Sequence, residues 1–203
     1  MVAVVDYGVG NLFSLCSSLA YIGVDCRVTG KAQELEQADK IILPGVGAFG
    51  DAAAKLKATG LDEQVIHQAE KGKPLLGICL GMQLLFERSL ELGFYTGLGL
   101  IKGEIRPLAG RIDSRLKVPH MGWNTLDFHR ESPLLKETAP GSYVYYVHSY
   151  YAADCDRAVV ASSHYGVEVP GIVQAGNVYG TQFHPEKSGP VGLGILRAFC
   201  ELG

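Results

Sequence analysis

The sequence has no strong excess of charge of either sign and no long hydrophobic run. Its 18 Lys and Arg residues and 21 Asp and Glu residues give a net charge of −3, so we expect no basic surface that attracts nucleic acid. No run approaches the roughly 18 apolar residues of a membrane-spanning helix. The first residues, MVAVVD, lack the basic region and the cleavage site of a signal peptide. We therefore expect a soluble, cytoplasmic protein that binds neither nucleic acid nor a membrane.

Paired cysteines are also absent. The five cysteines are odd in number and show no Cys-x-x-Cys spacing, which argues against a disulfide framework and against a structural zinc site. Cys16 and Cys200 fall on the apolar faces of expected helices, where they fill the core. Cys155 lies between two aspartates, whose charges oppose thiolate formation. Cys79 is the only cysteine whose surroundings favour a reactive thiol.

Cys79 lies at the centre of a Gly-x-nucleophile-x-Gly pattern, residues 77–81 (GICLG), between an apolar strand and a segment with helical spacing through Phe86. A sharp reversal from strand to helix strains the middle residue, and side chains two positions away on either side would collide. The thiol then stands at a helix N-terminus, where the dipole favours thiolate, and the N–H of Leu80 points at whatever the sulfur attacks. A buried core thiol is the alternative interpretation.

A second motif, residues 182–188 (QFHPEKS), supplies the partners that a cysteine nucleophile needs. His184 and Glu186 are two residues apart, so in an extended segment both side chains leave the same side of the backbone. Pro185 keeps His184 out of the helical region and stiffens the pair. The carboxylate can hold one ring nitrogen while the other faces the thiol. The alternatives are a surface turn, or a metal site with Cys79 that lacks a fourth ligand, and we expect no metal.

The order of expected elements predicts an α/β fold, and 203 residues fit one domain, residues 1–203. Strands alternate with helices over the first 90 or so residues, which implies a mostly parallel sheet with helices on both faces. The strands are at 2–6, 24–29, 40–43 and 74–78, and the helices at 11–22, 51–58 and 61–71. Further strands extend the sheet antiparallel or form a second small sheet, at 103–107, 111–118, 142–148, 158–163, 171–175 and 178–182, before a last helix at 191–202.

Residues 45–50 (GVGAFG) match the Gly-x-Gly-x-x-Gly fingerprint of dinucleotide-binding proteins, after a strand and before a helix. Asp51 occupies the expected N-cap of that helix, which places a carboxylate where the pyrophosphate would bind. The match also follows a later strand rather than the first. An earlier turn, residues 8–10, has Phe13 where the fingerprint needs glycine. We therefore expect no cofactor.

The glycine-rich turn has a better use beside Cys79. An oxyanion hole needs a second N–H donor besides that of Leu80, and Val46 or Gly47 can supply it because the turn follows the neighbouring strand. Glycine lets the peptide between Gly45 and Val46 rotate at little steric cost, so its N–H can face the oxyanion or turn away. We expect a docked partner to favour the inward orientation.

These motifs resemble those of the class I glutamine amidotransferase family along nearly the whole chain. GICLGMQ at 77–83, PGVGAFG at 44–50 and HPEKS at 184–188 match the nucleophile, oxyanion and His-Glu motifs of that class. The segments that resemble the glutaminase subunits of imidazole glycerol phosphate synthases are DYGVGN at 6–11, PHMGWN at 119–124 and YYVHSY at 145–150. The resemblance implies a three-layer fold and the hydrolysis of glutamine to glutamate and ammonia.

The resemblance also implies roles for the site residues. Cys79 attacks the carboxamide of glutamine, His184 protonates the departing ammonia and then activates water, and Glu186 orients His184. The oxyanion contacts come from Leu80, Val46 and Gly47. The contacts to the amino-acid end of the substrate come from Gln83, Glu91, Ser149 and Tyr150. For Glu91, an ordinary solvated loop carboxylate is the alternative interpretation.

The resemblance further implies a partner. Ammonia released into neutral water becomes ammonium and loses its nucleophilicity, so it must pass directly to an acceptor site, which this short chain lacks. The family pairs with a (β/α)₈ cyclase subunit that uses the ammonia on a phosphorylated ribulosyl nucleotide. Candidates for the docking face are Asn11, Ser14, Met121, Trp123 and the run 145–151. Core packing of Trp123 and a half-buried strand of tyrosines are the alternatives.

Two other functions compete with this interpretation. The chain could be the glutaminase of another amidotransferase of the class, such as that of anthranilate or pyridoxal phosphate synthesis, but the PHMGWN segment argues against it. It could also be a non-catalytic module that regulates a partner. The complete set of Cys79, His184 and Glu186 argues against that second alternative.

Overall fold

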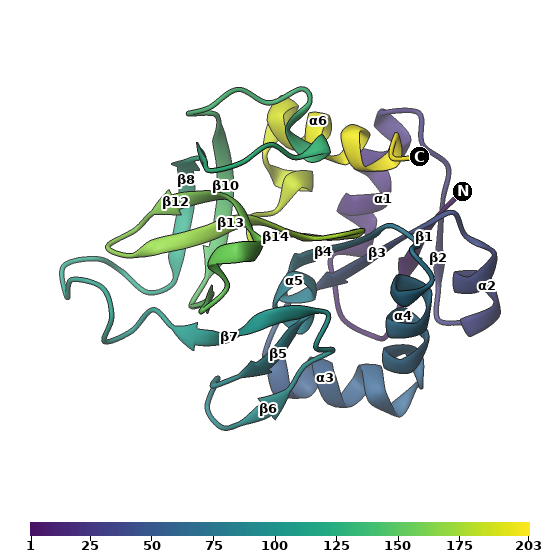
Figure 1. Ribbon diagram of the computed structural model, residues 1–203, viewed down its shortest axis with the longest axis horizontal. Coiled ribbons are helices and arrows are strands. Elements are labelled where there is room, and N and C mark those ends of the chain that lie inside the picture. Colours follow the sequence, from purple (N-terminus) through teal and green to yellow (C-terminus); the bar gives the residue numbers. More distant parts are fainter.

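The computed structural model describes residues 1–203 and contains a central eight-stranded sheet with the strand order β2-β1-β3-β4-β14-β13-β12-β9 (Figure 1). The pairs from β2 to β14 are parallel, and those from β14 to β9 are antiparallel. The predicted change from parallel to antiparallel strands in the C-terminal half is therefore confirmed. The strands are β1 (Val2–Val5), β2 (Cys26–Thr29), β3 (Lys40–Gly45), β4 (Leu75–Cys79), β9 (Asp127–Phe128), β12 (Val159–His164), β13 (Glu168–Ala175) and β14 (Val178–Thr181).

Helices cover both faces of this sheet, because successive side chains of a strand point to opposite faces and both faces are apolar. Ala3 and Val5 of β1 pack in a cluster with α2, α3, α4 and α5, whereas Val2 and Val4 pack in a second cluster with α1 and α6. The helices lie above and below the sheet in Figure 1, which gives three layers. They are α1 (Leu12–Tyr21), α2 (Ala32–Gln37), α3 (Phe49–Ala58), α4 (Leu61–Glu70), α5 (Leu80–Leu84) and α6 (Gly189–Cys200). None of them has the length and hydrophobicity needed to span a bilayer.

Two smaller sheets lie beside the central one (Figure 1). The first pairs β8 (His120–Thr125) with β10 (Tyr143–His148) in antiparallel fashion. The second has the order β11-β7-β5-β6 and consists of β5 (Phe86–Ser89), β6 (Tyr95–Thr96), β7 (Ile101–Pro107) and β11 (Tyr150–Ala153). The expected 142–148 strand thus belongs to a small sheet and not to the central one.

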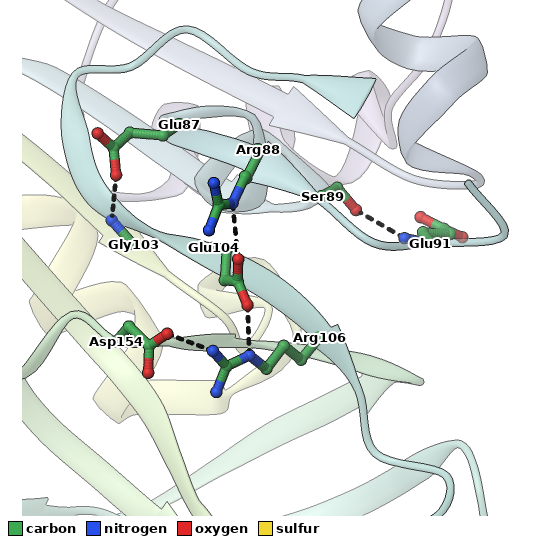
Figure 2. Close-up of polar contacts among 8 residues, drawn as sticks. All are labelled: Glu87, Arg88, Ser89, Glu91, Gly103, Glu104, Arg106 and Asp154. Carbon is green, nitrogen blue, oxygen red and sulfur yellow. Dashed lines mark hydrogen bonds and ion pairs between the residues drawn. The ribbon is translucent and has the colours of Figure 1, made fainter. Parts of the chain in front are cut away.

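A buried carboxylate links neighbouring strands of the four-stranded sheet through hydrogen bonds and ion pairs (Figure 2). Glu104 of β7 accepts hydrogen bonds from Arg88 Nε of β5 at 2.7 Å and from its neighbour Arg106 Nε at 2.5 Å. Arg106 also pairs with Asp154, directly after β11. These bonds hold the pKa of Glu104 below its usual range, because both guanidiniums favour the charged carboxylate. The network fixes the sheet from which the loop carrying Glu91 emerges.

Several local predictions were wrong. Residues 111–118 form turns and not a strand: the N–H of Leu116 donates to the carbonyl of Asp113 at 2.9 Å, and the alternating charged residues have no neighbouring strand to pair with. The helix after Cys79 ends at Leu84, and Phe86 begins β5. Residues 84–86 are all buried, so helical spacing could not be distinguished from a continuous apolar run there. α2, β5, β6, β8, β9 and β11 were not predicted.

The predicted cap of α3 was also wrong. α3 begins at Phe49 with Ala48 as N-cap, which places Asp51 within the first turn. The N–H of Phe49, which a pyrophosphate at this helix end would need, donates instead to Glu91 Oε2 at 2.8 Å. The expectation of no cofactor remains a prediction, and it now depends on this occupied donor as well as on the charge of Asp51.

Candidate active site

Cys79 is the last residue of β4 and the N-cap of α5, with φ 55° and ψ −111°. L-residues rarely adopt this conformation, so the predicted strained elbow is confirmed. The flanking glycines are required by close approach: a Cβ at Gly81 would lie 1.8 Å from the carbonyl oxygen of Leu43, and one at Gly77 would lie 2.7 Å from that of Gly81. Because α5 has only five residues, its dipole favours thiolate less than that of a long helix.

His184 and Glu186 form a buried pair. His184 Nδ1 donates to Glu186 Oε1 at 2.8 Å, and both side chains are 3% exposed, which excludes the surface-turn interpretation. His184 is extended, as predicted, but Pro185 begins a 3-10 turn (Pro185–Lys187) that contains Glu186. The carboxylate therefore reaches the ring because the chain turns back, and not because the whole segment is extended.

The environment of His184 favours its protonated form. Burial acts to lower the pKa of the imidazole, but hydrogen bonds with Cys79 and with Glu186, together with their charges, outweigh burial and raise this pKa to about 10. Since Nδ1 is bonded to Glu186, Nε2 is the nitrogen that faces the sulfur. The arrangement fits a thiolate paired with an imidazolium that can give its proton to a leaving group.

A cavity of about 340 Å³ brings together the residues that the sequence pointed to. Of the residues predicted to be catalytic, to form the oxyanion hole or to bind substrate, only Glu186 does not line the cavity. Glu186 lies behind His184. The residues from that prediction that do line the cavity are Val46, Gly47, Cys79, Leu80, Gln83, Glu91, Ser149, Tyr150 and His184. The structure contains no group of three or more His, Cys, Asp or Glu side chains arranged to hold a metal ion, and the expectation of no metal remains a prediction.

The turn after β3 lies beside the thiol. Gly45 is the register partner of Cys79 across β3 and β4, so Val46 and Gly47 follow at the level of the sulfur. Gly45 cannot carry a side chain, because its Cβ would lie 2.8 Å from both the N of Gly81 and the hydroxyl of Tyr7. Gly47 has a φ of +95°, which suits glycine. The turn can therefore bring a backbone N–H next to that of Leu80.

A buried glutamine whose role sequence reasoning missed lies next to the sulfur of Cys79, behind the residues that line the cavity. Gln182 is fully buried, and its Nε2 lies 3.8 Å from Cys79 Sγ. Gln83 Nε2 donates to Gln182 Oε1 and to the carbonyl of Tyr150, both at 3.0 Å. Gln182 directly precedes the Phe-His-Pro-Glu run, and that position was the only available signal of its importance.

Glu91 is not a free loop carboxylate. Its own N–H donates to Ser89 Oγ at 3.2 Å (Figure 2), and its Oε2 accepts from the N–H of Phe49 at the start of α3. Burial raises the pKa of the Glu91 carboxyl, and the Phe49 N–H partly offsets this effect. The carboxylate thus stands in the cavity while it caps the helix that follows the Val46–Gly47 turn.

Two buried histidines extend from the cavity wall, and sequence analysis predicted a role in the active site for neither, although His148 lies in the run 145–151 that it assigned to the docking face. His148 lines the cavity, its Nδ1 donates to the carbonyl of Tyr150 at 2.8 Å, and its Nε2 lies 2.9 Å from His120 Nδ1. The His120 ring stacks between Tyr146 and Tyr165, with centroid distances of 4.7 and 4.0 Å. Burial lowers the pKa of His120 to about 4 and that of His148 to about 3. Both rings are therefore neutral at pH 7.

This pair predicts a loss of stability on acidification. Between the ordinary histidine pKa of about 6.5 and the lowered pKa of about 4, the unfolded chain binds a proton at His120 that the folded chain does not. Stability is therefore present above pH 6.5 and falls toward pH 4. His120→Phe, which keeps the stacked ring, should reduce the pH slope of the unfolding free energy by about 1.4 kcal/mol per unit. Urea unfolding from pH 6 to 4.5 measures it, and equal slopes in both proteins would contradict the buried neutral ring.

Four of the docking candidates, Asn11, Ser14, Met121 and Trp123, lie on exposed or partly exposed surface, whereas the run 145–151 is partly buried. Met121 and Trp123 on β8 are 60% and 55% exposed, so core packing of Trp123 is excluded. Trp123 contacts Tyr145 of β10 edge-on, at a centroid distance of 5.9 Å. The tyrosine run is a half-buried strand, as the alternative had it, with Tyr146 fully buried. Asn11 caps α1 by accepting from the N–H of Ser14 at 3.5 Å, and both residues are partly buried.

Residues 3–201 match the model of the family described as glutamine amidotransferase class I. The chain belongs to the class I glutamine amidotransferase family. It is 52% identical over 205 residues to the imidazole glycerol phosphate synthase subunit HisH of Bacillus subtilis strain 168, covering 100% of this chain and 96% of that protein. It is 50% identical to the subunit of the same name from Oceanobacillus iheyensis, covering 100% and 99%. A crystal structure of a glutamine amidotransferase has the same fold, with a TM-score of 0.77 at 20% identity over 99% and 98% of the two chains.

Proposed function

We propose that this chain, as one domain of residues 1–203, is the glutaminase subunit of an imidazole glycerol phosphate synthase. It hydrolyses glutamine and passes the ammonia to a cyclase subunit, which makes imidazole glycerol phosphate and aminoimidazole carboxamide ribotide in histidine biosynthesis. The observation that carries the proposal is the buried His184–Glu186 pair beside Cys79 at the wall of one cavity. The two relatives, about 50% identical over the whole chain, support the choice of synthase.

The chemistry divides into two steps. The Cys79 thiolate attacks the carboxamide carbon of glutamine, and the N–H of Leu80 with that of Val46 or Gly47 stabilises the oxyanion. The imidazolium of His184 gives its Nε2 proton to the departing nitrogen, so ammonia leaves and a glutamyl thioester remains. The neutral imidazole then takes a proton from water, which attacks the thioester and releases glutamate and the thiolate. Glu186 holds the Nδ1–H throughout.

The hydrogen bonds that Gln83 makes within the protein determine which of its atoms faces the substrate. Both hydrogens of its amide nitrogen are donated within the protein, to Tyr150 and to Gln182, so its carbonyl oxygen is the atom that it offers to the cavity. An oxygen acceptor suits the α-ammonium group of glutamine, as does the carboxylate of Glu91. Ser149 and Tyr150 contribute the remaining contacts to the amino-acid end of the substrate.

The partner is a (β/α)₈ cyclase, and the complex works in the cytoplasm. Met121 and Trp123 are the large exposed apolar side chains of β8, and such groups make the buried anchors of protein interfaces. Asn11 and Ser14 add polar contacts from the start of α1. Direct transfer of ammonia through this interface keeps it unprotonated until it reacts.

Glutamate release should depend on the partner. We expect the isolated chain to be slower than the complex with cyclase and acceptor-site ligand by at least about 10²-fold, since one missing oxyanion donor costs 10²–10³ in rate. The measurement compares the chain alone, with cyclase, and with cyclase plus ligand. Equal rates in all three would contradict the peptide switch at Gly45–Val46. Failure to co-purify with the cyclase would contradict the proposed partner.

Trp123 provides a test of the docking face. Trp123→Ala should weaken binding of the cyclase by 10-fold or more, because anchors of this kind contribute about 2 kcal/mol or more. Tyr21→Ala, which removes an aromatic ring that is 80% exposed at the end of α1, is the matched control and should leave the affinity unchanged. Titration calorimetry gives both values. An equal loss in the two variants, or none in Trp123→Ala, would remove Trp123 from the interface.

A further inference from the structure

Three polar contacts connect Tyr150, Gln83, Gln182 and Cys79 in series, and Gln182 is the one of these four residues that does not line the cavity. Gln182 follows β14, and its N–H donates to the carbonyl of Gly171 at 2.9 Å, which continues the pairing of β13 and β14. Its side chain is fully buried beneath the sulfur. A buried amide needs partners for both of its ends, and here they are Gln83 and Cys79.

The direction of each hydrogen bond follows from one fixed acceptor. The carbonyl of Tyr150 can only accept, so the amide nitrogen of Gln83 must face it. That nitrogen also faces Gln182, which therefore presents its oxygen to Gln83. The nitrogen of Gln182 is consequently turned toward Cys79 Sγ, where it can donate a hydrogen. An amide donor beside sulfur favours the ionised form, which accepts hydrogen bonds better than the thiol does.

A neutral thiol has a different partner. The carbonyl of Val147 lies 4.0 Å from the sulfur and can only accept, so it suits the S–H and opposes the thiolate. Gln182 and His184 are the two donors that favour the charged sulfur. Loss of one of these donors should shift the balance toward the thiol bonded to Val147.

We propose that Gln182 is a positioning residue, which donates a hydrogen bond to the Cys79 thiolate and holds the nucleophile in register with the substrate-binding Gln83. The inference rests on the proposed role of Cys79 as the nucleophile. Gln182 does not touch the reacting carboxamide. It links the group that attacks the side-chain end of glutamine to the group that holds its amino-acid end, so both ends of the site are aligned by one side chain.

Alkylation of the thiol measures this directly in the full-length chain. Iodoacetamide reacts with thiolate, so the pH profile of Cys79 modification, followed by peptide mass spectrometry, gives the thiol pKa. In Gln182→Met, which keeps the length and removes the donor, we expect the rate of Cys79 alkylation at pH 7 to fall about tenfold, because one lost hydrogen bond to a charged group costs about that factor. Gln68→Met is the matched control: Gln68 is also buried, on α4, and this variant should react like the unmodified sequence.

Gln182→Glu tests the same contact in nearly the same shape. Its carboxylate cannot donate and repels the thiolate, so Cys79 should react more slowly at pH 7 than in Gln182→Met, although the side chain has the size of the original. For glutamine-dependent turnover of the complex we expect kcat/KM to fall about tenfold or more in both variants, with ammonium-dependent turnover unchanged. The Gln182→Glu variant keeps the test open if Gln182→Met does not fold.

The outcomes separate this inference from the proposed function. An unchanged alkylation profile in either folded Gln182 variant would overturn the positioning role, whatever happens to turnover. Slower alkylation of Cys79 at pH 7 only in the Gln182 variants, with the Gln68 control unaffected, would support it. By contrast, glutamine-dependent synthesis that survives in Cys79→Ala would overturn the proposed function itself.

Discussion

Cys79→Ala should abolish glutamine-dependent synthesis by the complex and leave synthesis from added ammonium salt intact. Only the release of ammonia uses the thiol, so the acceptor site of the partner needs nothing from Cys79 once ammonia is supplied. Removing a catalytic nucleophile lowers turnover by on the order of 10⁴-fold or more. The measurement is product formation by the complex with glutamine and, separately, with ammonium chloride at alkaline pH. Loss of both activities would mean that Cys79 has a structural role.

The other four cysteines are the controls for this experiment. None of them lines the cavity, and burial raises the pKa of the Cys155 thiol to about 12, with a further contribution from its two neighbouring aspartates. Replacing any one of them with alanine should change stability only, and glutaminase turnover should persist. The four positions are Cys16, Cys26, Cys155 and Cys200. Inactivation by one of these substitutions without unfolding would contradict the assignment of a single nucleophile.

His184→Ala should be nearly as damaging as the loss of the thiol, because one imidazole serves as acid in the first step and as base in the second. General acid–base catalysis alone contributes about 10²–10⁴-fold, and the alanine variant also loses the imidazolium that favours the thiolate. Glutamate release and alkylation of Cys79 should therefore both slow. Normal alkylation together with lost turnover would separate His184 from the thiol and contradict their pairing.

Glu186→Gln should cost less than His184→Ala, since the imidazole remains but is less well oriented. The carboxylate also helps to raise the pKa of His184, so its loss should move the alkaline limb of the kcat/KM profile to lower pH. The exposed pair of His164 Nδ1 and Glu168 Oε1, 3.0 Å apart, is the matched control, and His164→Ala should leave the profile unchanged. A fully active Glu186→Gln variant would contradict the proposal that Glu186 orients His184.

The sequence was sufficient for the fold class because its strongest signals are local. β1 and β4 are continuous apolar runs, and the elbow around Cys79 requires its glycines whatever the surroundings. The errors fall where a segment depends on a distant partner. The 120–125 strand exists because it pairs with β10. The strand predicted at 111–118 does not form, because it has no such partner. Neither fact can be read from the segment itself.

The predictions for the site succeeded and failed for the same reason. The sequence named Cys79, His184 and the turn after β3, because their motifs are contiguous and chemically distinctive. It missed Gln182, His120 and His148, which are buried polar residues that matter only through partners far along the chain. The roles assigned to the cavity residues stay predictions until the variants are measured.

The contact between Glu91 and Phe49 limits how the turn beside the thiol can move. The hydroxyl of Tyr7 donates to the carbonyl of Pro44 at 2.8 Å on one side of the turn, and Glu91 holds the N–H of Phe49 on the other. Only a few residues between these two anchors are free to change their dihedral angles. Any rearrangement there is therefore a local crankshaft rotation of single peptides and not the opening of a lid. Such a motion needs no refolding of β3 or α3, the two elements that flank the turn.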